Sequence, residues 1–352
     1  MLDVSTNVRE GEELDIVSLG VYLRSRLPTP FDKVVVEQYP EGNSNLTYLI
    51  RLGERSFVLR RPPFGNTVKS AHDMKREYWV LKKLSKLYPL APEPFLFCED
   101  TSVIGAEFYL MERRRGVILR GEVPQELAGS RELQEKVLRS FIRNLIRLHR
   151  VDLKAAILSE LGNPEGYNQR QVEGWTKRYI TAKTEEHLEL EEAIKWLNAN
   201  VPAESGASLI HNDYKFDNIM LSSDDLTRVV AVLDWEMVTV GDPLMDLGTT
   251  LGYWMSPEFG EEMMNMPFNP RVLMENFSRR DLADMYAEAS DHELPDLLFY
   301  YVFGTFKISV IAQQIYARYS KGLTKDPRFA NFDRFVGDLG RIAAKSIDKG
   351  RI

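Results

Sequence analysis

The chain has 352 residues, which is longer than one hydrophobic core usually supports, so two lobes are expected. A formal net charge of -7 argues against nucleic acid as a partner, because phosphate binding needs a basic face. The single cysteine, Cys98, excludes a disulfide within the chain and suits a reducing compartment. The polar N-terminal residues and the lack of an apolar run long enough to span a bilayer predict a cytoplasmic protein without membrane contact.

Short strands and two helices are predicted in the first third of the chain. Apolar residues at helical spacing predict a helix over Glu13–Leu27, which ends before Pro28. Another helix is predicted over Lys69–Leu87, and the proline-rich residues 89–94 end it. Gly53-Glu54 is typical of a hairpin turn between two strands. The predicted strands are residues 34–36, 46–52, 56–60, 95–98 and 107–111.

The pattern changes after Glu112, where long helices dominate. Helices are predicted over residues 132–149 and 175–197, and a short strand pair is predicted near residues 218–221 and 229–233. The predicted fold class is therefore α+β and bilobal. A small N-terminal lobe with an antiparallel sheet covers residues 1–112, and a larger, mainly helical lobe covers residues 113–352.

The strongest chemical signal is LIHNDYKFDN, residues 209–218. Two apolar residues lead into a turn that carries His211, Asp213 and Asn218 at the spacing of a kinase catalytic loop. Phosphoryl transfer depends on positioning and charge neutralisation, so an unprotonated carboxylate must face the attacking hydroxyl. Asp213 is therefore predicted to be the catalytic base. Lys215 is predicted to neutralise the transferring phosphate, with a solvent-exposed lysine as the alternative interpretation.

A second signal follows in VVAVLDWE, residues 229–236. A buried apolar strand ends at Asp234, which would place a carboxylate at the lip of a cleft, and Mg²⁺ prefers oxygen ligands. Asp234-Trp235-Glu236 takes the place of the Asp-Phe-Gly of protein kinases. Asn218 and Asp234 are accordingly predicted to bind the metal. A lone aspartate in a turn is more often a helix cap or a surface residue, whereas both motifs in this order indicate a kinase site.

With these motifs the sequence resembles the aminoglycoside phosphotransferase and choline kinase superfamily. Within it, the sequence is most similar to the group related to the kinase-like domain fused to some acyl-CoA dehydrogenases. The resemblance implies a protein-kinase-like fold, ATP (or GTP) with magnesium, and transfer to a small-molecule hydroxyl. The residues that carry it are His211-Asn212-Asp213, Asn218, Leu233-Asp234-Trp235-Glu236, Gly241-Asp242-Pro243 and Asp246.

The predicted N-terminal lobe offers three nucleotide-contacting features. Asn43, Ser44 and Asn45 lie in the hairpin where a kinase covers the phosphates, although one glycine stands there rather than three, and an ordinary turn is the alternative. Arg60 stands where a kinase strand presents its phosphate-binding lysine, and its predicted partner is Glu77. An exposed strand arginine and a solvated helix charge are the alternatives for these two residues.

The third feature is the segment that links the two lobes. Met111 and Glu112 end an apolar strand at the position where a kinase backbone hydrogen-bonds the adenine edge. The assignment rests on position in the chain, because an apolar strand that ends in glutamate is common.

Two other functions compete with a small-molecule kinase. A protein kinase is disfavoured because no Ala-Pro-Glu-like segment is present and Gly241-Asp242-Pro243 follows Asp234 closely. A non-catalytic kinase-like scaffold stays open because Arg60 replaces the usual lysine. The group resemblance implies a hydroxyacyl compound or hydroxyacyl-CoA as acceptor. An aminoglycoside is the alternative, because the acidic residues 185–192 could attract a cation, although a solvated helix face explains them as well.

Overall fold

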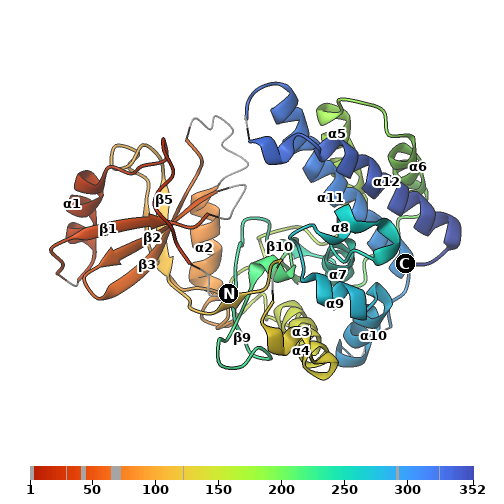
Figure 1. Ribbon diagram of the computed structural model, residues 1–352, viewed down its shortest axis with the longest axis horizontal. Helices are drawn as coiled ribbons and strands as arrows, with labels where there is room; N and C mark the ends of the chain where they lie inside the picture. The colour runs from red at the N-terminus through yellow and green to blue at the C-terminus, as the bar shows by residue number, and fades with distance from the viewer. Residues whose placement is uncertain are drawn as a thin grey trace. The chain divides into compact units, whose positions relative to one another are not determined.

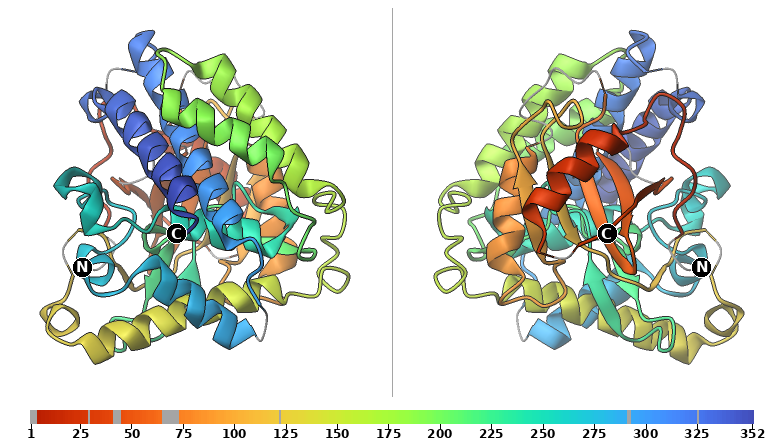
Figure 2. Two further views of the ribbon diagram at one scale, coloured as in Figure 1. Left: turned by 90° about the vertical axis from the view of Figure 1, so that its right-hand side faces the viewer. Right: turned by 90° about the vertical axis from the view of Figure 1, so that its left-hand side faces the viewer.

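The computed structural model describes residues 4–28, 30–40, 45–64, 73–121, 123–290, 293–324 and 326–352 (Figures 1 and 2). The chain divides into two compact units. The sheet unit comprises the described residues up to Ile118 together with Met220–Glu236, and the helical unit comprises Leu119–Ile219 and Met237–Ile352. The division thus falls after Ile118 rather than after Glu112. It also assigns the segment that contains Asp234 to the sheet unit.

A five-stranded antiparallel sheet forms the centre of the sheet unit, in the order β1-β2-β3-β5-β4. Its strands are β1 (Val34–Gln38), β2 (Leu46–Leu52), β3 (Arg55–Arg61), β4 (Pro94–Cys98) and β5 (Phe108–Glu112), and its helices are α1 (Ile16–Arg26) and α2 (Met74–Leu84). Gly53 has a φ of 61° in the predicted hairpin turn, a conformation that glycine adopts without strain. Asp73 caps α2, so that helix starts later than predicted, and residues 69–72 of the prediction lie outside the described residues.

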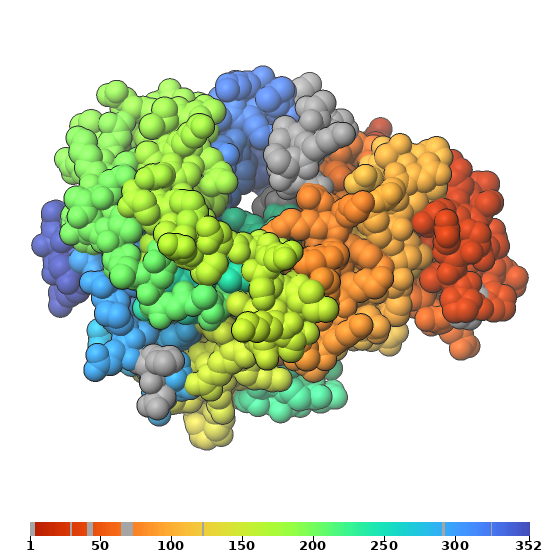
Figure 3. All heavy atoms as spheres, turned by 180° about the vertical axis from the view of Figure 1, so that it is seen from behind, coloured from red at the N-terminus to blue at the C-terminus, as the bar shows by residue number. Residues whose placement is uncertain are grey.

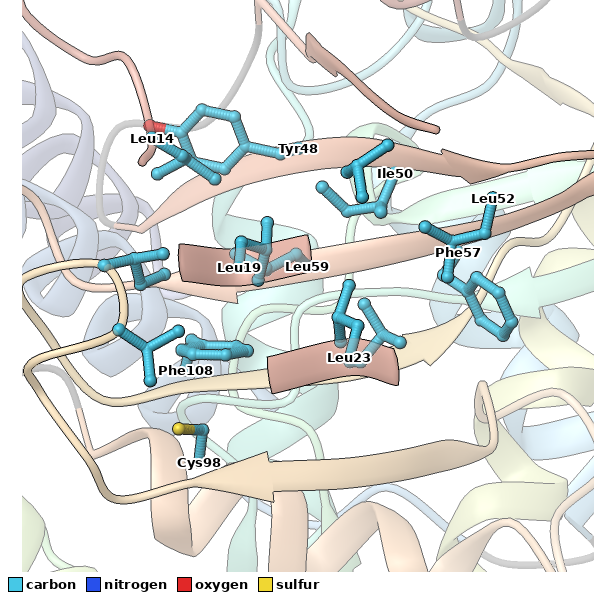
Figure 4. Close-up of a cluster of buried hydrophobic side chains, with 14 of the residues drawn as sticks. Leu14, Leu19, Leu23, Tyr48, Ile50, Leu52, Phe57, Leu59, Cys98 and Phe108 are labelled. Carbon is cyan, nitrogen blue, oxygen red and sulfur yellow. The ribbon is translucent and has the colours of Figure 1, made fainter. Parts of the chain in front are cut away.

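Alternate side chains of the sheet form one core with α1, which Figure 4 shows. Leu19 and Leu23 of α1 belong to it together with Tyr48 and Ile50 of β2. Phe57 and Leu59 of β3 belong to this core, so strand alternation turns Val58 and Arg60 to the opposite face. The core therefore determines which side of β3 presents Arg60.

A second, three-stranded sheet in the order β6-β8-β9 explains why the sheet unit extends beyond Glu112. β6 (Val117–Ile118) pairs antiparallel with β8 (Ile219–Leu221), and β9 (Val229–Val232) continues the sheet. Ile118, Met220 and Ala231 form a small buried cluster there. Asp234 follows two residues after the end of β9.

The helical unit is built around the long helix α11 (Leu297–Ser320), which packs against α5, α6, α7 and α12. Its other elements are α3 (Gln125–Ala128), α4 (Arg131–His149), α5 (Tyr167–Ala182), α6 (Leu188–Ala199), β7 (Ser208–Ile210), β10 (Thr239–Gly241), α7 (Pro243–Gly252), α8 (Glu261–Met264), α9 (Arg271–Asn276), α10 (Arg279–Ser290), α12 (Phe332–Lys349) and the 3₁₀ turns η2 (Phe216–Asn218), η3 (Pro257–Phe259) and η4 (Pro327–Phe329). No described helix is both long and apolar enough to cross a membrane.

The single helix predicted over residues 175–197 is wrong. Two helices, α5 and α6, occupy this region, and the backbone is extended at Lys183 and at His187 between them. Gln313 of α11 donates to Ala182 O (3.0 Å) and to Thr184 Oγ1 (2.9 Å), which satisfies the carbonyl end of α5. A tertiary contact therefore holds a break that helical periodicity does not reveal. Residues 150–200, with α5 and α6, form much of the outer surface of the helical unit in Figure 3 (yellow-green and green).

Candidate active site

The segment that carries Asp213 follows β7, which pairs antiparallel with β10. The buried carboxylate of Asp246, on α7, accepts hydrogen bonds from His211 N and Asn212 N, both at 2.7 Å. His149 of α4 contacts the same carboxylate at 3.2 Å. Burial alone would raise the pKa of Asp246, but these contacts and the nearby histidines hold it below its usual value. Asp246 thus anchors the turn as an anion.

Asn212, directly before Asp213, has a left-handed backbone with a φ of 66°. Its side-chain amide donates to Met237 O (3.1 Å). The ammonium of Lys307 donates to Asn212 O (2.7 Å) and to Asn212 Oδ1 (3.0 Å). Asparagine is among the residues that tolerate this conformation, and the surrounding contacts hold it there. Lys307 was missed in the sequence, where the only sign of it is a lysine within the apolar stretch of α11.

Both carboxylate oxygens of Asp213 accept hydrogen bonds within the helical unit. Tyr253 Oη donates to Oδ1 (2.6 Å), while Lys215 Nζ and Asn218 Nδ2 both donate to Oδ2 (2.8 Å each). Burial would raise the pKa of Asp213, but the Lys215 charge and these hydrogen bonds hold it below its usual value. Asp213 is therefore an ionised, oriented carboxylate.

Lys215 is paired rather than solvent-exposed, so the alternative interpretation of it is wrong. Its side chain is 13% exposed, and its ammonium lies 4.8 Å from the ring centre of Tyr253. Burial would lower the pKa of Lys215, but Asp213 outweighs it and keeps the pKa above its usual range. Tyr253 follows directly after α7, and its polar contact with Asp213 is a role that the sequence pattern does not reveal.

Asn218 lies in the 3₁₀ turn η2 rather than in the predicted strand. Its amide nitrogen donates to Asp213 Oδ2 and also to Asp213 O (2.9 Å). Because the nitrogen is turned toward Asp213, the carbonyl oxygen of the same amide points away from that carboxylate. An oxygen in this position is the kind of atom that a hard cation takes as a ligand.

In the sheet unit, Arg60 forms the predicted pair with Glu77. Arg60 Nη1 donates to Glu77 Oε1 (2.9 Å), and Arg60 Nη2 donates to Asp234 Oδ1 (3.1 Å). The side chains of Arg60 and Glu77 are 8% and 1% exposed, so neither is the surface charge that the alternatives proposed. Glu236 Oε2 lies 3.8 Å from Arg60 Nη2. Asp234 has a φ of 64°, so it, too, has a left-handed backbone.

This cluster in the sheet unit carries more negative than positive charge. The Arg60 guanidinium faces the carboxylates of Glu77, Asp234 and Glu236, and a second guanidinium, that of Arg76, donates to Glu236 O (3.0 Å). Burial alone would lower the pKa of Arg60. These carboxylates raise it by more, so the pKa of Arg60 lies above its usual value. Burial raises the pKa of Glu77, which Arg60 offsets only in part. A divalent cation bound here would reduce the imbalance.

Of the other predicted nucleotide residues, Asn45 directly precedes β2, and Met111 and Glu112 end β5. Asn45 is buried and donates to Glu236 Oε2 (2.8 Å), whereas Asn43 and Ser44 lie outside the described residues. Met111 pairs with Val58 of β3 in the sheet. Glu112 N donates to Glu93 O (2.8 Å), so any contact of Glu112 with an adenine edge would have to use its carbonyl.

Comparisons with known proteins agree with this description. The chain belongs to the phosphotransferase enzyme family, whose sequence model matches residues 35–274. It is 35% identical to acyl-CoA dehydrogenase family member 11 of Gallus gallus over 343 residues, which cover 95% of this chain and 44% of that protein. It is 34% identical to family member 10 of Mus musculus, covering 87% of this chain and 28% of that protein. The chain thus spans less than half the length of these curated relatives.

Solved structures show the same fold. A Ralstonia eutropha protein provisionally classed as an aminoglycoside phosphotransferase is 27% identical with a TM-score of 0.75, covering 95% of this chain and 99% of that one. Choline kinase of Cryptosporidium parvum is 15% identical with a TM-score of 0.64, covering 95% and 96%. The predicted α+β, protein-kinase-like fold and the resemblance to this superfamily are confirmed.

Proposed function

We propose that the chain is an ATP- and magnesium-dependent kinase that phosphorylates a hydroxyl group of a small molecule, with Asp213 as catalytic base. The observation that carries this proposal is the ionised carboxylate of Asp213, which three side chains hold in one orientation. Oδ2 receives two donors and Oδ1 receives one, so Oδ1 keeps a lone pair for the proton of an acceptor hydroxyl. A base in hydrogen-bond reach of that proton is what general base catalysis needs.

The negative charge of the phosphates is proposed to be neutralised by Lys215 and by a magnesium ion that Asn218 and Asp234 bind. Lys215 fits this role because it stays protonated beside Asp213. Asn218 and Asp234 are proposed as magnesium ligands, and their amide and carboxylate oxygens fit a hard cation. When bound, magnesium would supply positive charge to the phosphate oxygens. The excess of carboxylates around Arg60 supports the presence of a cation at Asp234.

Nucleotide binding is proposed for the residues of the sheet unit. Arg60 would contact the phosphates through its fork of donors, held by Glu77. Asn45 is proposed to contact them beside Glu236, and Met111 and Glu112 to contact the adenine of ATP, with GTP as the alternative. The same roles for Asn43 and Ser44 stay predictions. In support, a thermostable mutant of aminoglycoside phosphotransferase APH(4)-Ia, with a TM-score of 0.60 and 15% identity, was solved with ADP and hygromycin B.

The acceptor is proposed to be a hydroxyacyl compound or hydroxyacyl-CoA rather than an aminoglycoside. The identity of 35% to an acyl-CoA dehydrogenase family member favours this acceptor. The surroundings of Asp213 agree, because Tyr253 packs against Phe268 at 4.9 Å between ring centres, and Phe268 against Phe335 at 6.1 Å. Apolar rings beside the base suit an apolar chain better than a polycation. Part of the acidic stretch is also neutralised internally, since Lys183 pairs with Glu191.

A panel of acceptors tests the proposal. MgATP consumption would be followed with a hydroxyacyl-CoA, choline and hygromycin B, and each product would be identified by mass spectrometry. We expect phosphorylated hydroxyacyl-CoA as the main product. The same reaction with Asp213→Asn should lose turnover, whereas Asp224→Asn, at an exposed aspartate, should keep it. Stabilisation by nucleotide without turnover on any acceptor would instead support the non-catalytic scaffold.

A further inference from the structure

Lys307 is buried in the middle of α11, at 1% exposure, although lysine is rarely buried without a charged partner. Among the described residues, no carboxylate lies within ion-pair distance of its ammonium. Both hydrogen bonds of the ammonium go instead to neutral oxygens of one residue, Asn212. The ring centre of Trp175, on α5, lies 5.7 Å away and compensates the buried charge only weakly. A buried charge of this kind needs an explanation other than stability.

The two contacts of Lys307 act on Asn212, the residue that leads directly into Asp213. Asn212 O belongs to the same peptide group as Asp213 N, and Asp213 N donates to His211 Nδ1 (3.3 Å). Because the peptide group is planar, a fixed Asn212 carbonyl also fixes the backbone nitrogen of Asp213, and with it the direction in which the Asp213 side chain leaves the backbone. The second contact, to Asn212 Oδ1, holds the side chain of a residue with a positive φ. Asp246 and Met237 bind other atoms of Asn212, but Lys307 alone among these partners binds its carbonyl oxygen.

We propose that Lys307 is a positioning residue for phosphoryl transfer, which keeps Asn212 in its left-handed conformation and thereby aims the carboxylate of Asp213. The proposal rests on the proposed function, because the orientation of the Asp213 carboxylate affects turnover only if Asp213 is the base. In this role Lys307 acts through Asn212 and not on the acceptor or the nucleotide. Without its ammonium, Asn212 relaxes toward negative φ, and the Asp213 carboxylate leaves the hydroxyl of Tyr253.

Lys307→Met tests the proposal because methionine fills a similar volume and removes the charge and both hydrogen bonds. We expect turnover with MgATP and the most active acceptor of the panel to fall on the order of tenfold to a hundredfold, the scale of a misplaced catalytic group. The Michaelis constant for ATP should stay within about twofold, since ground-state binding is not altered. Lys321→Met, at the exposed end of the same helix, is the matched control and should leave both unchanged.

A second substitution separates positioning from general support of the fold. Glycine adopts positive φ without strain, so the Asn212→Gly variant should keep this conformation without the hydrogen bonds of Lys307. In the Lys307→Met background, Asn212→Gly should therefore restore turnover severalfold. A role of Lys307 in stabilising the helical unit as a whole predicts no restoration. Absence of restoration in a folded double variant would overturn the proposal.

Crystal structures of the same variants decide the question even without activity. In Lys307→Met we expect a negative φ at Asn212 and loss of the hydrogen bond between Tyr253 Oη and Asp213 Oδ1. An unchanged φ near 66° with that hydrogen bond intact would refute the proposal. Asp213→Asn is assayed in parallel. If turnover does not depend on Asp213, the proposed function fails, while the crystal structures still show whether Lys307 holds Asn212.

Discussion

Two residues of the candidate site have a strained backbone. Of the four described residues other than glycine with positive φ, Asn212 precedes the proposed base and Asp234 is a proposed metal ligand. Each such residue costs on the order of 1–3 kcal/mol and persists only where surrounding contacts hold it. Asn212 is held by Asp246 and Lys307, and Asp234 by Arg60. The protein thus gives up stability at Asp234, a proposed metal ligand, and directly before Asp213, the proposed base.

The buried ammonium of Lys307 gives the stability of the protein a specific pH dependence. Burial lowers the pKa of Lys307 to about 8, whereas an unfolded lysine titrates near pH 10.4. Between about pH 8 and about pH 10.4 the unfolded chain therefore binds more protons at this site than the folded chain, and the free energy of unfolding rises with pH. Below about pH 8 the lysine is charged in both states, and its burial penalty is fully present.

Lys307→Met should remove this dependence. Relative to the wild type, the variant should be stabilised most near about pH 7 and progressively less towards about pH 10, as urea unfolding at both values would show. The charged groups that face Lys307 are Asp246 on α7, Asp213 and Lys215 in the segment after β7, and Arg178 on α5. The pKa values of both carboxylates are lowered and that of Lys215 is raised, so these two carboxylates and Lys215 do not titrate in this window. A difference in stability that stays constant with pH would contradict a lowered pKa.

At the scale of elements, β3 and α2 together present the proposed phosphate contact. Arg60→Ala should raise the Michaelis constant for ATP and lower turnover, because the lost contact serves both the ground state and the transition state. Arg60→Lys should recover part of the loss, since the charge remains but the fork of donors does not. Steady-state kinetics would measure both. Arg55→Ala, at an exposed arginine of the same strand, is the matched control and should behave like the wild type.

Folding must be controlled for in this experiment. Arg60→Ala leaves Glu77 buried without its partner, and breaking a buried ion pair in this way costs about 3–5 kcal/mol. Glu77→Gln in the Arg60→Ala background removes the unpaired charge and should restore much of the stability. It should not restore ATP affinity. Normal ATP kinetics in a folded Arg60→Ala variant would exclude Arg60 from the phosphate site.

Close packing of α7 against α11 connects the two helices that hold Asn212. A Cβ on Gly304 would lie 2.1 Å from Gly248 O, which no small adjustment can accommodate. Gly304→Ala should therefore separate the helices, lower stability by about 1–3 kcal/mol, and lower turnover, because Asp246 and Lys307 move apart. Thermal unfolding and kinetics would measure both. Gly174→Ala in α5, where the nearest atom would be 3.6 Å away, should keep full activity. Normal stability of Gly304→Ala would contradict this prediction, because it would show that α7 and α11 can move apart at Gly304 without loss of stability.

At the scale of the whole molecule, the proposed machinery is distributed over both units. Arg60, Glu77 and Asp234 belong to the sheet unit, whereas Asp213 and Asn218 belong to the helical unit. The chain passes from the helical unit to the sheet unit after Ile219 and returns after Glu236. The motif that contains Asp213 and the motif that contains Asp234 therefore lie in different units, although they are close in the sequence. The proposed nucleotide contacts and the proposed base thus belong to different units, and variants of the two groups should differ in their kinetics.

Local sequence pattern accounts for much of the fold and for the central residues of the candidate site. The predicted pair of Arg60 with Glu77 is confirmed, and strand alternation turns Arg60 away from the core residues Phe57 and Leu59. The division of residues 175–197 into two helices was not predictable, because Gln313 of α11 holds the break. Lys307 and Tyr253 were missed for the same reason. Their contacts join residues that are 95 and 40 positions apart, and no local periodicity encodes such contacts.

The central claim, that Asp213 is the catalytic base of a kinase, is tested most directly by one comparison of the wild type with Asp213→Asn. Calorimetry would give the dissociation constant for MgATP, and transfer of the labelled γ-phosphoryl group to a hydroxyacyl-CoA would give turnover. We predict turnover lower by on the order of a hundredfold or more in Asp213→Asn, with the dissociation constant within about twofold of the wild-type value. Full turnover in Asp213→Asn would contradict the claim.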